Sequence, residues 1–454
     1  MKRIDRVVIS LILFCLIILT VIIWFGSQTP VDVVCQSSSG CDKVSPLGAL
    51  TFTFSRPVDS SSVESAWVTD PLIEGKWTWT DPQHAHWNSL KPLPSNKGIK
   101  LTLKSSRIGQ NGESLNESLT WNVEVRKPDI VMVKEVGQGQ ELFVVNLDGG
   151  EERRLTDTDG RVFDYEISPD GETILFSVVN AQRGIDFWSV HRDGTGQTKV
   201  LDCGGDRCST PAWSHISQEL AYTRVGPGLT PEGSLGQPRI WILDMKTGQT
   251  SQLFKDSRRL GYGAVWSPDG QWLSIWDELE GGILIVNRQS GETILLSSGN
   301  GDTGCWSPDS QYLYYANILN GEAGFRNVIY RMVIEDRVVS TAFGGNIEGG
   351  GLSMEKPVCS PVDDWLAVSI QPAIKIPGRE LHLLNPDVKD GIVISEDLTR
   401  IPGFYSWTPS GDRLLYQLSG LGSQFNDRQI WVWERATHTQ SKIVEDASNP
   451  RWLP

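Results

Sequence analysis

Between residues 46 and 127 the chain alternates between apolar and polar positions. The run LTFTFS places Leu50, Phe52 and Phe54 on one face of an extended segment, and KWTWT and LTWNVEV show the same alternation. A period of two in short runs, separated by turn residues, is typical of half-buried β-strands. The pattern therefore predicts a small β-sandwich over residues 46–127.

A second pattern, an internal repeat, occupies residues 128–454. Each copy carries Ser-Pro-Asp-Gly or a degraded form of it, an aliphatic residue six positions after the serine, and another apolar residue eight positions after it. The serine position, a threonine in the last copy, falls at Ser168, Ser214, Ser267, Ser307, Ser360 and Thr408. Each copy contains four short strand-like runs, which we call A to D, and the anchor ends run A. Four-stranded units that recur every 40–53 residues predict a β-propeller.

The ends of the repeat region are incomplete in complementary ways. The region begins with runs that correspond to strands B, C and D, without a strand A. It ends on SNPRWLP, which corresponds to a strand A alone, and Trp452 lies a normal repeat step of 45 residues after Trp407. We expect the two fragments to form one composite blade that closes the ring. The count is then seven blades of about 47 residues each.

Two stretches of the chain resemble known families. The SPDG anchors with their following apolar runs and the LDGG-like turn resemble TolB and its WD-repeat-like relatives over residues 128–454. This resemblance implies a propeller that binds proteins of the bacterial cell envelope, and it implies six blades as the alternative to seven. The segments GALTFTFSRPVD, GKWTWT and SLTWNVEVRKP resemble a bacterial Ig-like domain, which implies a spacer or adhesion module at residues 46–127.

The N-terminal segment predicts a membrane anchor. Residues 7–25 carry no charge, and 19 residues at about 1.5 Å each match the hydrocarbon core of a bilayer. Basic residues lie in the preceding residues 1–6, and the next basic residue after the segment is Lys43. The positive-inside rule then predicts a cytoplasmic tail, a signal-anchor helix and a periplasmic or extracellular remainder, with residues 26–45 as spacer. The expected localisation is the cell membrane, and the expected fold class is all-β after this helix.

The net charge limits the classes of partner, and the cysteine spacing indicates the redox compartment. The net charge of −14 argues against nucleic acid as a partner, because phosphate binding needs a basic surface. Short cysteine spacings favour disulfides in an oxidising compartment. The candidate pairs are Cys35 with Cys41 and Cys203 with Cys208. Cys305 and Cys359 fall inside expected strands, where we predict buried small apolar residues.

Signatures of catalysis and of metal or cofactor binding are weak. The chain has no G-x-S-x-G, H-E-x-x-H or P-loop motif. His84 and His86 lack further ligands nearby, and Asp157 and Asp159 in LTDTDG lack the later ligands of a calcium loop, so we predict neither a metal nor a cofactor. The repeated tryptophans beside the anchors are expected to pack between sheets. These patterns leave catalysis open and favour a non-enzymatic role.

The loops indicate where binding could take place. The A–B turns are short, whereas the B–C and D–A connections, which emerge together on the opposite face, are long and varied. We predict that this loop-rich face, with the mouth of the central channel, binds an envelope protein or a cell-wall polymer. The alternatives are a carbohydrate-active hydrolase or lyase at the channel mouth and a structural surface-layer component. The candidate contact residues are Arg258, Arg259 and Tyr262 on a D–A loop, and Asp164, Glu166 and Glu355 near the starts of A strands.

Overall fold

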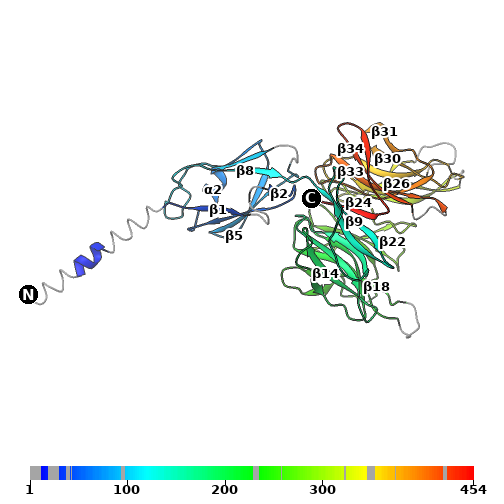
Figure 1. Ribbon diagram of the computed structural model, residues 1–454, viewed down its shortest axis with the longest axis horizontal. Coiled ribbons are helices and arrows are strands. Elements are labelled where there is room, and N and C mark those ends of the chain that lie inside the picture. Colours follow the sequence, from blue (N-terminus) through cyan, green and yellow to red (C-terminus); the bar gives the residue numbers. More distant parts are fainter. Residues whose placement is uncertain are drawn as a thin grey trace, which may run out of the picture. The chain divides into compact units, whose positions relative to one another are not determined.

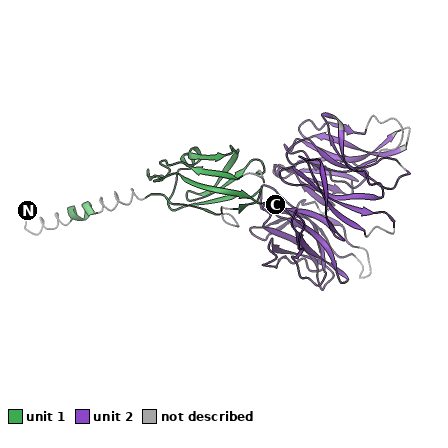
Figure 2. Ribbon diagram, turned by 45° about the horizontal axis from the view of Figure 1, so that its top comes forward, with its two compact units in different colours: residues 1–126 green, residues 127–454 purple. Residues whose placement is uncertain are grey.

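The computed structural model describes residues 12–454 except 19–29, 37–40, 42, 94–97, 229–234, 257, 322–323, 345–352, 374 and 423–426. It divides into two compact units, residues 1–126 and 127–454, which Figure 2 shows in different colours. Strands dominate both units, which confirms the all-β class of the folded part of the chain.

The prediction of a membrane-spanning helix is wrong. The described helical stretch near the N-terminus covers residues 12–18. Across the described residues, no helix is long and apolar enough to cross a membrane, so the predicted single-pass localisation has no support either. Residues 7–11 and 19–25 of the expected span, and the expected tail 1–6, lie outside the described residues.

Unit 1 consists of two four-stranded sheets around one apolar core. Alternate residues of its strands point inward, and Phe52 lies 5.2 Å from Trp77 and 5.4 Å from Trp121 between ring centroids. Its elements are β1 (Val33–Gln36), β2 (Lys43–Val44), β3 (Leu50–Phe54), α2 (Ser60–Ala66), β4 (Trp67–Asp70), β5 (Gly75–Asp81), β6 (His84–Ser89), β7 (Ile99–Leu103) and β8 (Leu119–Val125). The sheets run β1-β3-β6-β5 and β2-β8-β7-β4.

Unit 2 is a β-propeller whose described strands form seven four-stranded blades. Blades 2 and 3 share one sheet because a single parallel bridge, Ile185 to Arg207, joins them. Blade 1 contains β36 (Ser448–Leu453), β9 (Asp129–Val136), β10 (Gly139–Val145) and β11 (Arg153–Arg154). The strand order confirms the predicted closure: β36 supplies strand A of blade 1, and Trp452 pairs with Ile130 of β9. The C-terminus accordingly lies near β9 (Figure 1).

The other blades follow the chain in the order A, B, C, D. Their strands are, for blade 2, β12 (Val162–Ile167), β13 (Thr173–Val179), β14 (Ile185–His191) and β15 (Thr198–Leu201); for blade 3, β16 (Arg207–Trp213), β17 (Glu219–Val225), β18 (Pro238–Asp244) and β19 (Thr250–Gln252); for blade 4, β20 (Tyr262–Trp266), β21 (Trp272–Asp277), β22 (Gly282–Asn287) and β23 (Thr293–Ser297). Blade 5 has β24 (Cys305–Trp306), β25 (Tyr312–Gly321), β26 (Gly324–Val333) and β27 (Val339–Phe343); blade 6 has β28 (Ser353–Cys359), β29 (Leu366–Gln371), β30 (Glu380–Asn385) and β31 (Val388–Ser395); blade 7 has β32 (Arg400–Trp407), β33 (Arg413–Gly420), β34 (Arg428–Glu434) and β35 (Thr439–Glu445).

The anchor serines shape the A–B turns. The Ser267 hydroxyl donates to Asp269 Oδ1 over 2.5 Å and accepts from the Trp272 N–H over 2.9 Å. Ser168 and Ser307 make the same pair of bonds in their own turns. All six anchor positions, Ser168, Ser214, Ser267, Ser307, Ser360 and Thr408, are buried. Because each hydroxyl satisfies a local backbone donor, these residues are structural.

The tryptophans beside the anchors connect neighbouring blades. In four of the five, all but Trp213, the indole N–H donates to the carbonyl that precedes the equivalent tryptophan position in the blade before it. The bonds join Trp266 to Ala212 (3.0 Å), Trp306 to Val265 (3.2 Å), Trp407 to Val358 (3.3 Å) and Trp452 to Ser406 (3.0 Å). The repeat therefore places one directional bond at the same place in four of the inter-blade seams.

One seam uses a disulfide at this place. Cys359 occupies the tryptophan position of blade 6, and Cys305 occupies the acceptor position of blade 5. The two residues form a disulfide, so the expectation of two separate buried apolar cysteines was wrong. The prediction failed because the two cysteines are 54 residues apart in the chain, and only the packing of two neighbouring blades brings them together. Cys35–Cys41 and Cys203–Cys208 are also disulfides in the structure.

Candidate functional site

Irregular backbone surrounds the propeller axis. In six blades the pairing of strand A with strand B shifts register shortly before the tryptophan position. Four non-glycine residues at these bulges, Thr210, Lys356, Phe404 and Asn449, adopt left-handed φ values between 47° and 52°. Such bulges redirect side chains and are frequent next to functional sites. The inner wall of the propeller is therefore a plausible place for binding.

A cavity of about 400 Å³, here called the channel cavity, lies along these A strands. Its wall comes from β12, β16, β20, the residue Thr303, and Arg451 of the closing strand. It extends to Pro169 and His215, which lie in A–B turns, so it reaches the short-turn side of the propeller. The predicted candidates Asp164 and Glu166 both line it.

Burial shapes the electrostatics of the channel cavity. Burial raises the pKa of Glu166, although its ion pair with Arg451 opposes the shift. Burial likewise raises the pKa of Asp164 and lowers that of His215. The Arg451 guanidinium lies 5.3 Å from the ring centre of Tyr165, whose hydroxyl donates to the Asn449 carbonyl over 2.5 Å. The closing strand thus supplies the positive charge of the cavity, which the sequence did not reveal.

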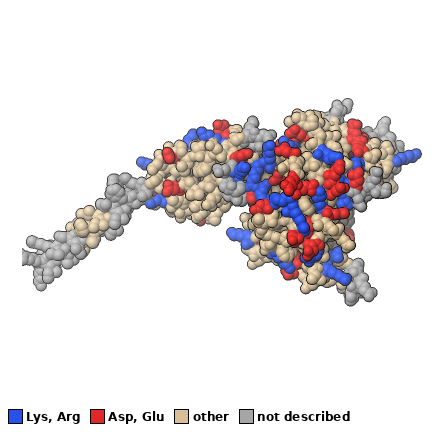
Figure 3. Space-filling model, in the orientation of Figure 1, with Lys and Arg blue, Asp and Glu red and all other residues tan. Residues whose placement is uncertain are grey.

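The other predicted contact residues lie apart from this cavity. Arg258 is 85% exposed and pairs with Asp256, while Arg259 reaches the buried Asp277 over 3.3 Å. Glu355 pairs with Arg379 over 2.6 Å. Basic and acidic side chains are interspersed over the visible face of the propeller in Figure 3. Charge alone therefore does not mark a docking surface on that face.

Exposed aromatic residues mark the loop-rich face instead. In the described part of the propeller four aromatic side chains are largely exposed: Phe163 (55%), Tyr262 (37%), Phe325 (76%) and Phe404 (57%). Phe163 and Tyr262 lie towards the starts of A strands, and Phe325 lies at the end of the long B–C hairpin of blade 5, so these three belong to the loop-rich side. Phe404 lies in the bulge of β32. Only Tyr262 had been predicted, although Phe163 and Tyr262 share one repeat position, four residues before the tryptophan position.

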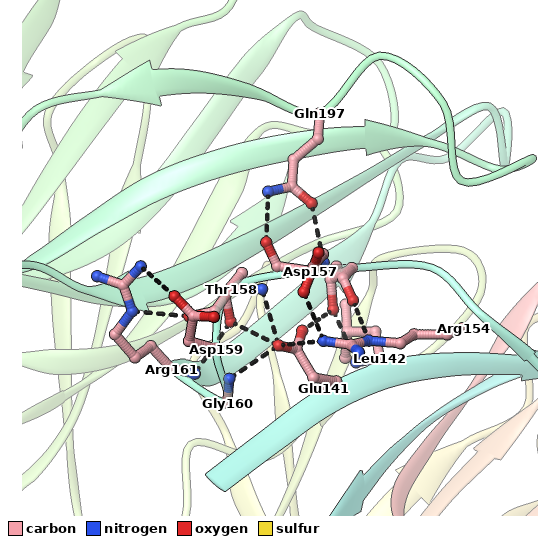
Figure 4. A network of polar contacts seen from close by, with 10 residues as sticks. Glu141, Leu142, Arg154, Asp157, Thr158, Asp159, Gly160, Arg161 and Gln197 are labelled. Carbon is pink, nitrogen blue, oxygen red and sulfur yellow. Dashed lines mark hydrogen bonds and ion pairs between the residues drawn. The ribbon is translucent and has the colours of Figure 1, made fainter. Parts of the chain in front are cut away.

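The LTDTDG segment forms a hydrogen-bonded turn around Glu141 (Figure 4). Glu141 is fully buried and accepts bonds from Arg154, Thr158 and Gly160, and a 2.5 Å bond from Thr156. Burial raises the pKa of Glu141, but these bonds outweigh that effect and hold the pKa below its usual value. Within the described residues, no three His, Cys, Asp or Glu side chains are grouped as metal ligands would be. Glu141 therefore organises this D–A loop.

We predict that Glu141→Gln destabilises the propeller by about 2–3 kcal/mol, because buried donors lose their acceptor. A glutamate with a lowered folded pKa contributes stability above its unfolded pKa of about 4.3, and this contribution is lost as the pH falls through the folded pKa. Urea unfolding from pH 7 to pH 3 should show a larger loss in the wild type than in Glu141→Gln. The exposed neighbour variant Glu151→Gln should behave like the wild type; equal profiles for Glu141→Gln and wild type would contradict this role.

Comparisons with known proteins support the fold. No family model matches the chain, so the Ig-like assignment of unit 1 has no support. The "Uncharacterized peptidase YuxL" of Bacillus subtilis is 30% identical over 167 residues, which cover 36% of this chain and 22% of that protein. The acylaminoacyl peptidase of Pyrococcus horikoshii superposes with a TM-score of 0.51 at 13% identity, and the match covers 70% of this chain and 51% of the peptidase chain. TolB from Acinetobacter baumannii gives a TM-score of 0.42 at 15% identity, covering 72% and 82%.

These similarities bear on the propeller and not on its activity. At 13% identity, the peptidase structure supports the β-propeller fold alone. This chain spans about a fifth of the curated relative and about half of the peptidase structure. A function must therefore be argued from the surface of this protein.

Proposed function

We propose that this protein is a binding scaffold whose propeller takes a partner protein on its loop-rich face. The observation that supports this most is the set of four exposed aromatic side chains: Phe163, Tyr262 and Phe325 lie where strands meet the long loops, and Phe404 lies in the bulge of β32. Exposed aromatics cost solubility when they have no partner, and they are the residues that contribute most to protein interfaces. By the family resemblance, a protein of the cell envelope is the first candidate partner.

The scaffold around these residues suits binding. Phe404 lies in a bulge whose backbone is fixed by the pairing of β32 with β33, and the β25–β26 hairpin extends ten paired residues on each strand. Aromatic side chains held on paired strands lose little entropy when a partner binds. The predicted contact residue Tyr262 belongs to this set, whereas Arg259 and Glu355 are engaged in ion pairs of the propeller itself.

We predict that replacing Phe163, Tyr262, Phe325 and Phe404 by serine lowers the affinity for the partner by about tenfold or more, because each anchor contributes about 1 kcal/mol or more. The full chain would be immobilised without reductant, and proteins captured from envelope extract would be quantified by mass spectrometry. The matched control carries Ile216→Ser and Val362→Ser, two exposed apolar residues in A–B turns on the opposite face.

The outcomes separate the alternatives. The proposal is supported if the wild type and the control both enrich one protein that the four-serine variant does not enrich. Equal enrichment by all three proteins would contradict it. Enrichment of a glycan in place of a protein would support a cell-wall polymer as ligand and would contradict a protein partner.

A further inference from the structure

The channel cavity runs along the A strands, and none of the four exposed aromatics is part of its wall. Its wall extends from Asp164 and Gly263, near the starts of β12 and β20, to Pro169 and His215 in A–B turns. A volume of about 400 Å³ falls within the range of small-molecule sites and is too small for a folded partner. Any ligand of this cavity is therefore small, and it differs from the protein partner proposed above.

The charges in the cavity do not balance. Arg451 forms an ion pair with Glu166, faces the Tyr165 ring and also interacts electrostatically with Asp164, so one cation serves two carboxylates. Asp164 accepts a 2.8 Å bond from its neighbour Tyr165 N–H, and among the described residues it forms no ion pair within 4.0 Å. Burial lowers the pKa of His215 and favours its neutral form, so His215 does not supply the missing positive charge. The described wall thus holds two carboxylates, Asp164 and Glu166, and one cation, Arg451.

In the part of the chain that the structure describes, the seam between blades 2 and 3, which borders the channel cavity, lacks the indole-to-carbonyl bond. Four other seams contain an indole-to-carbonyl bond, but the Trp213 indole N–H is buried without a hydrogen-bond partner among the residues described. Trp213 lines the cavity together with Glu166, whose carbonyl holds the equivalent acceptor position in blade 2. The indole-to-carbonyl bond is therefore absent between the described residues of blades 2 and 3, and Trp213 and Asp164 line the same cavity. Trp213, Pro211 and Ile167 make the adjoining wall largely apolar.

We propose that the channel cavity binds a small organic cation, a primary ammonium group on a short apolar chain. The ammonium group pairs with Asp164 and neutralises the excess negative charge, while the chain lies against Trp213 and Pro211. An aromatic face next to a carboxylate is a favourable surface for an ammonium group. This site does not rest on the proposed protein partner, because Asp164, Trp213 and Pro211 are different residues from the exposed aromatics.

The test uses n-butylammonium as the probe and 1-butanol as its neutral counterpart. At pH 7 the amine is almost fully protonated, as a lysine side chain is. Titration of the full-length protein, followed by calorimetry, should show saturable binding of the amine and none of the alcohol. Asp164→Asn should weaken the binding about tenfold or more, because it removes the charged partner. Glu355→Gln changes a carboxylate outside the cavity and should leave the binding unchanged.

A second measurement avoids the risk that Asp164→Asn disturbs folding. In the wild type, butyl protons of the bound amine should give intermolecular NOEs to the indole protons of Trp213. No saturable binding of the amine would overturn the proposal, as would equal binding of amine and alcohol. Unchanged binding to a folded Asp164→Asn variant, or NOEs only to residues outside the cavity, would overturn it too.

Discussion

Deletion of residues 449–454 is expected to lower the melting temperature of the propeller by about 10 °C or more. The deletion removes Trp452 and Leu453, which are 6% and 1% exposed, and losing two such side chains costs roughly 5–10 kcal/mol. It also leaves β9 as an open edge, because β36 is its neighbour in blade 1. Differential scanning calorimetry of the full chain and the truncated chain measures the effect.

A complementation control separates closure from nonspecific damage. A synthetic peptide of residues 446–454 should raise the melting temperature of the truncated protein in a concentration-dependent way, since ligands of the folded state stabilise it by mass action. The same peptide with Trp452→Ser should do so much less, because it lacks the indole that donates to the Ser406 carbonyl. A truncated protein that melts like the full chain would show that the ring does not depend on β36.

The second large effect concerns the seam between blades 5 and 6. Replacing Cys305 and Cys359 by serine should destabilise the propeller by roughly 4 kcal/mol, because the disulfide closes a loop of 54 residues. Equilibrium unfolding in urea under non-reducing conditions gives the free energies. Serine variants of the Cys203–Cys208 pair, separated by 5 residues, are the matched control and should lose roughly 2 kcal/mol.

A rescue variant tests why the disulfide occurs at this place. Cys305→Ala combined with Cys359→Trp recreates the indole and the small acceptor residue of the Trp266–Ala212 seam. We expect it to recover about 1–3 kcal/mol relative to the double serine variant, through indole burial and one hydrogen bond. If the tryptophan variant is no more stable than the serine variant, Cys359 is not the equivalent of the seam tryptophans.

The sequence predicted those features that repeat along the chain. Ser267 and its equivalents mark the A–B turns because the turn chemistry is local, and Trp452 was placed in a closing strand because its spacing from Trp407 matches a repeat step. The channel carboxylate Glu166 was also predicted. Its partner Arg451 was not, because the ion pair joins residues at opposite ends of the propeller sequence, and only ring closure brings them together.

Other features depend on geometry that a pattern does not contain. Phe404 was not predicted to be exposed, because its orientation follows from a left-handed bulge residue at φ 48°. Cys305 and Cys359 look like ordinary strand residues until two blades are packed side by side. The apolar run at residues 7–25 predicted a membrane span from length and hydropathy, but among the described residues no helix is long and apolar enough to cross a membrane.

Site-specific photo-crosslinking tests the proposed binding face most directly. A photoreactive phenylalanine analogue would replace Phe163 or Phe325 on the loop-rich face, Phe404 in the bulge of β32, and Ile216 or Val362 on the opposite face, in the full chain expressed in its own host. We predict discrete covalent adducts with one protein from the first three positions and none from the last two. Adducts from Ile216 or Val362 alone, or no adduct from any of the five positions, would contradict a partner on the loop-rich face.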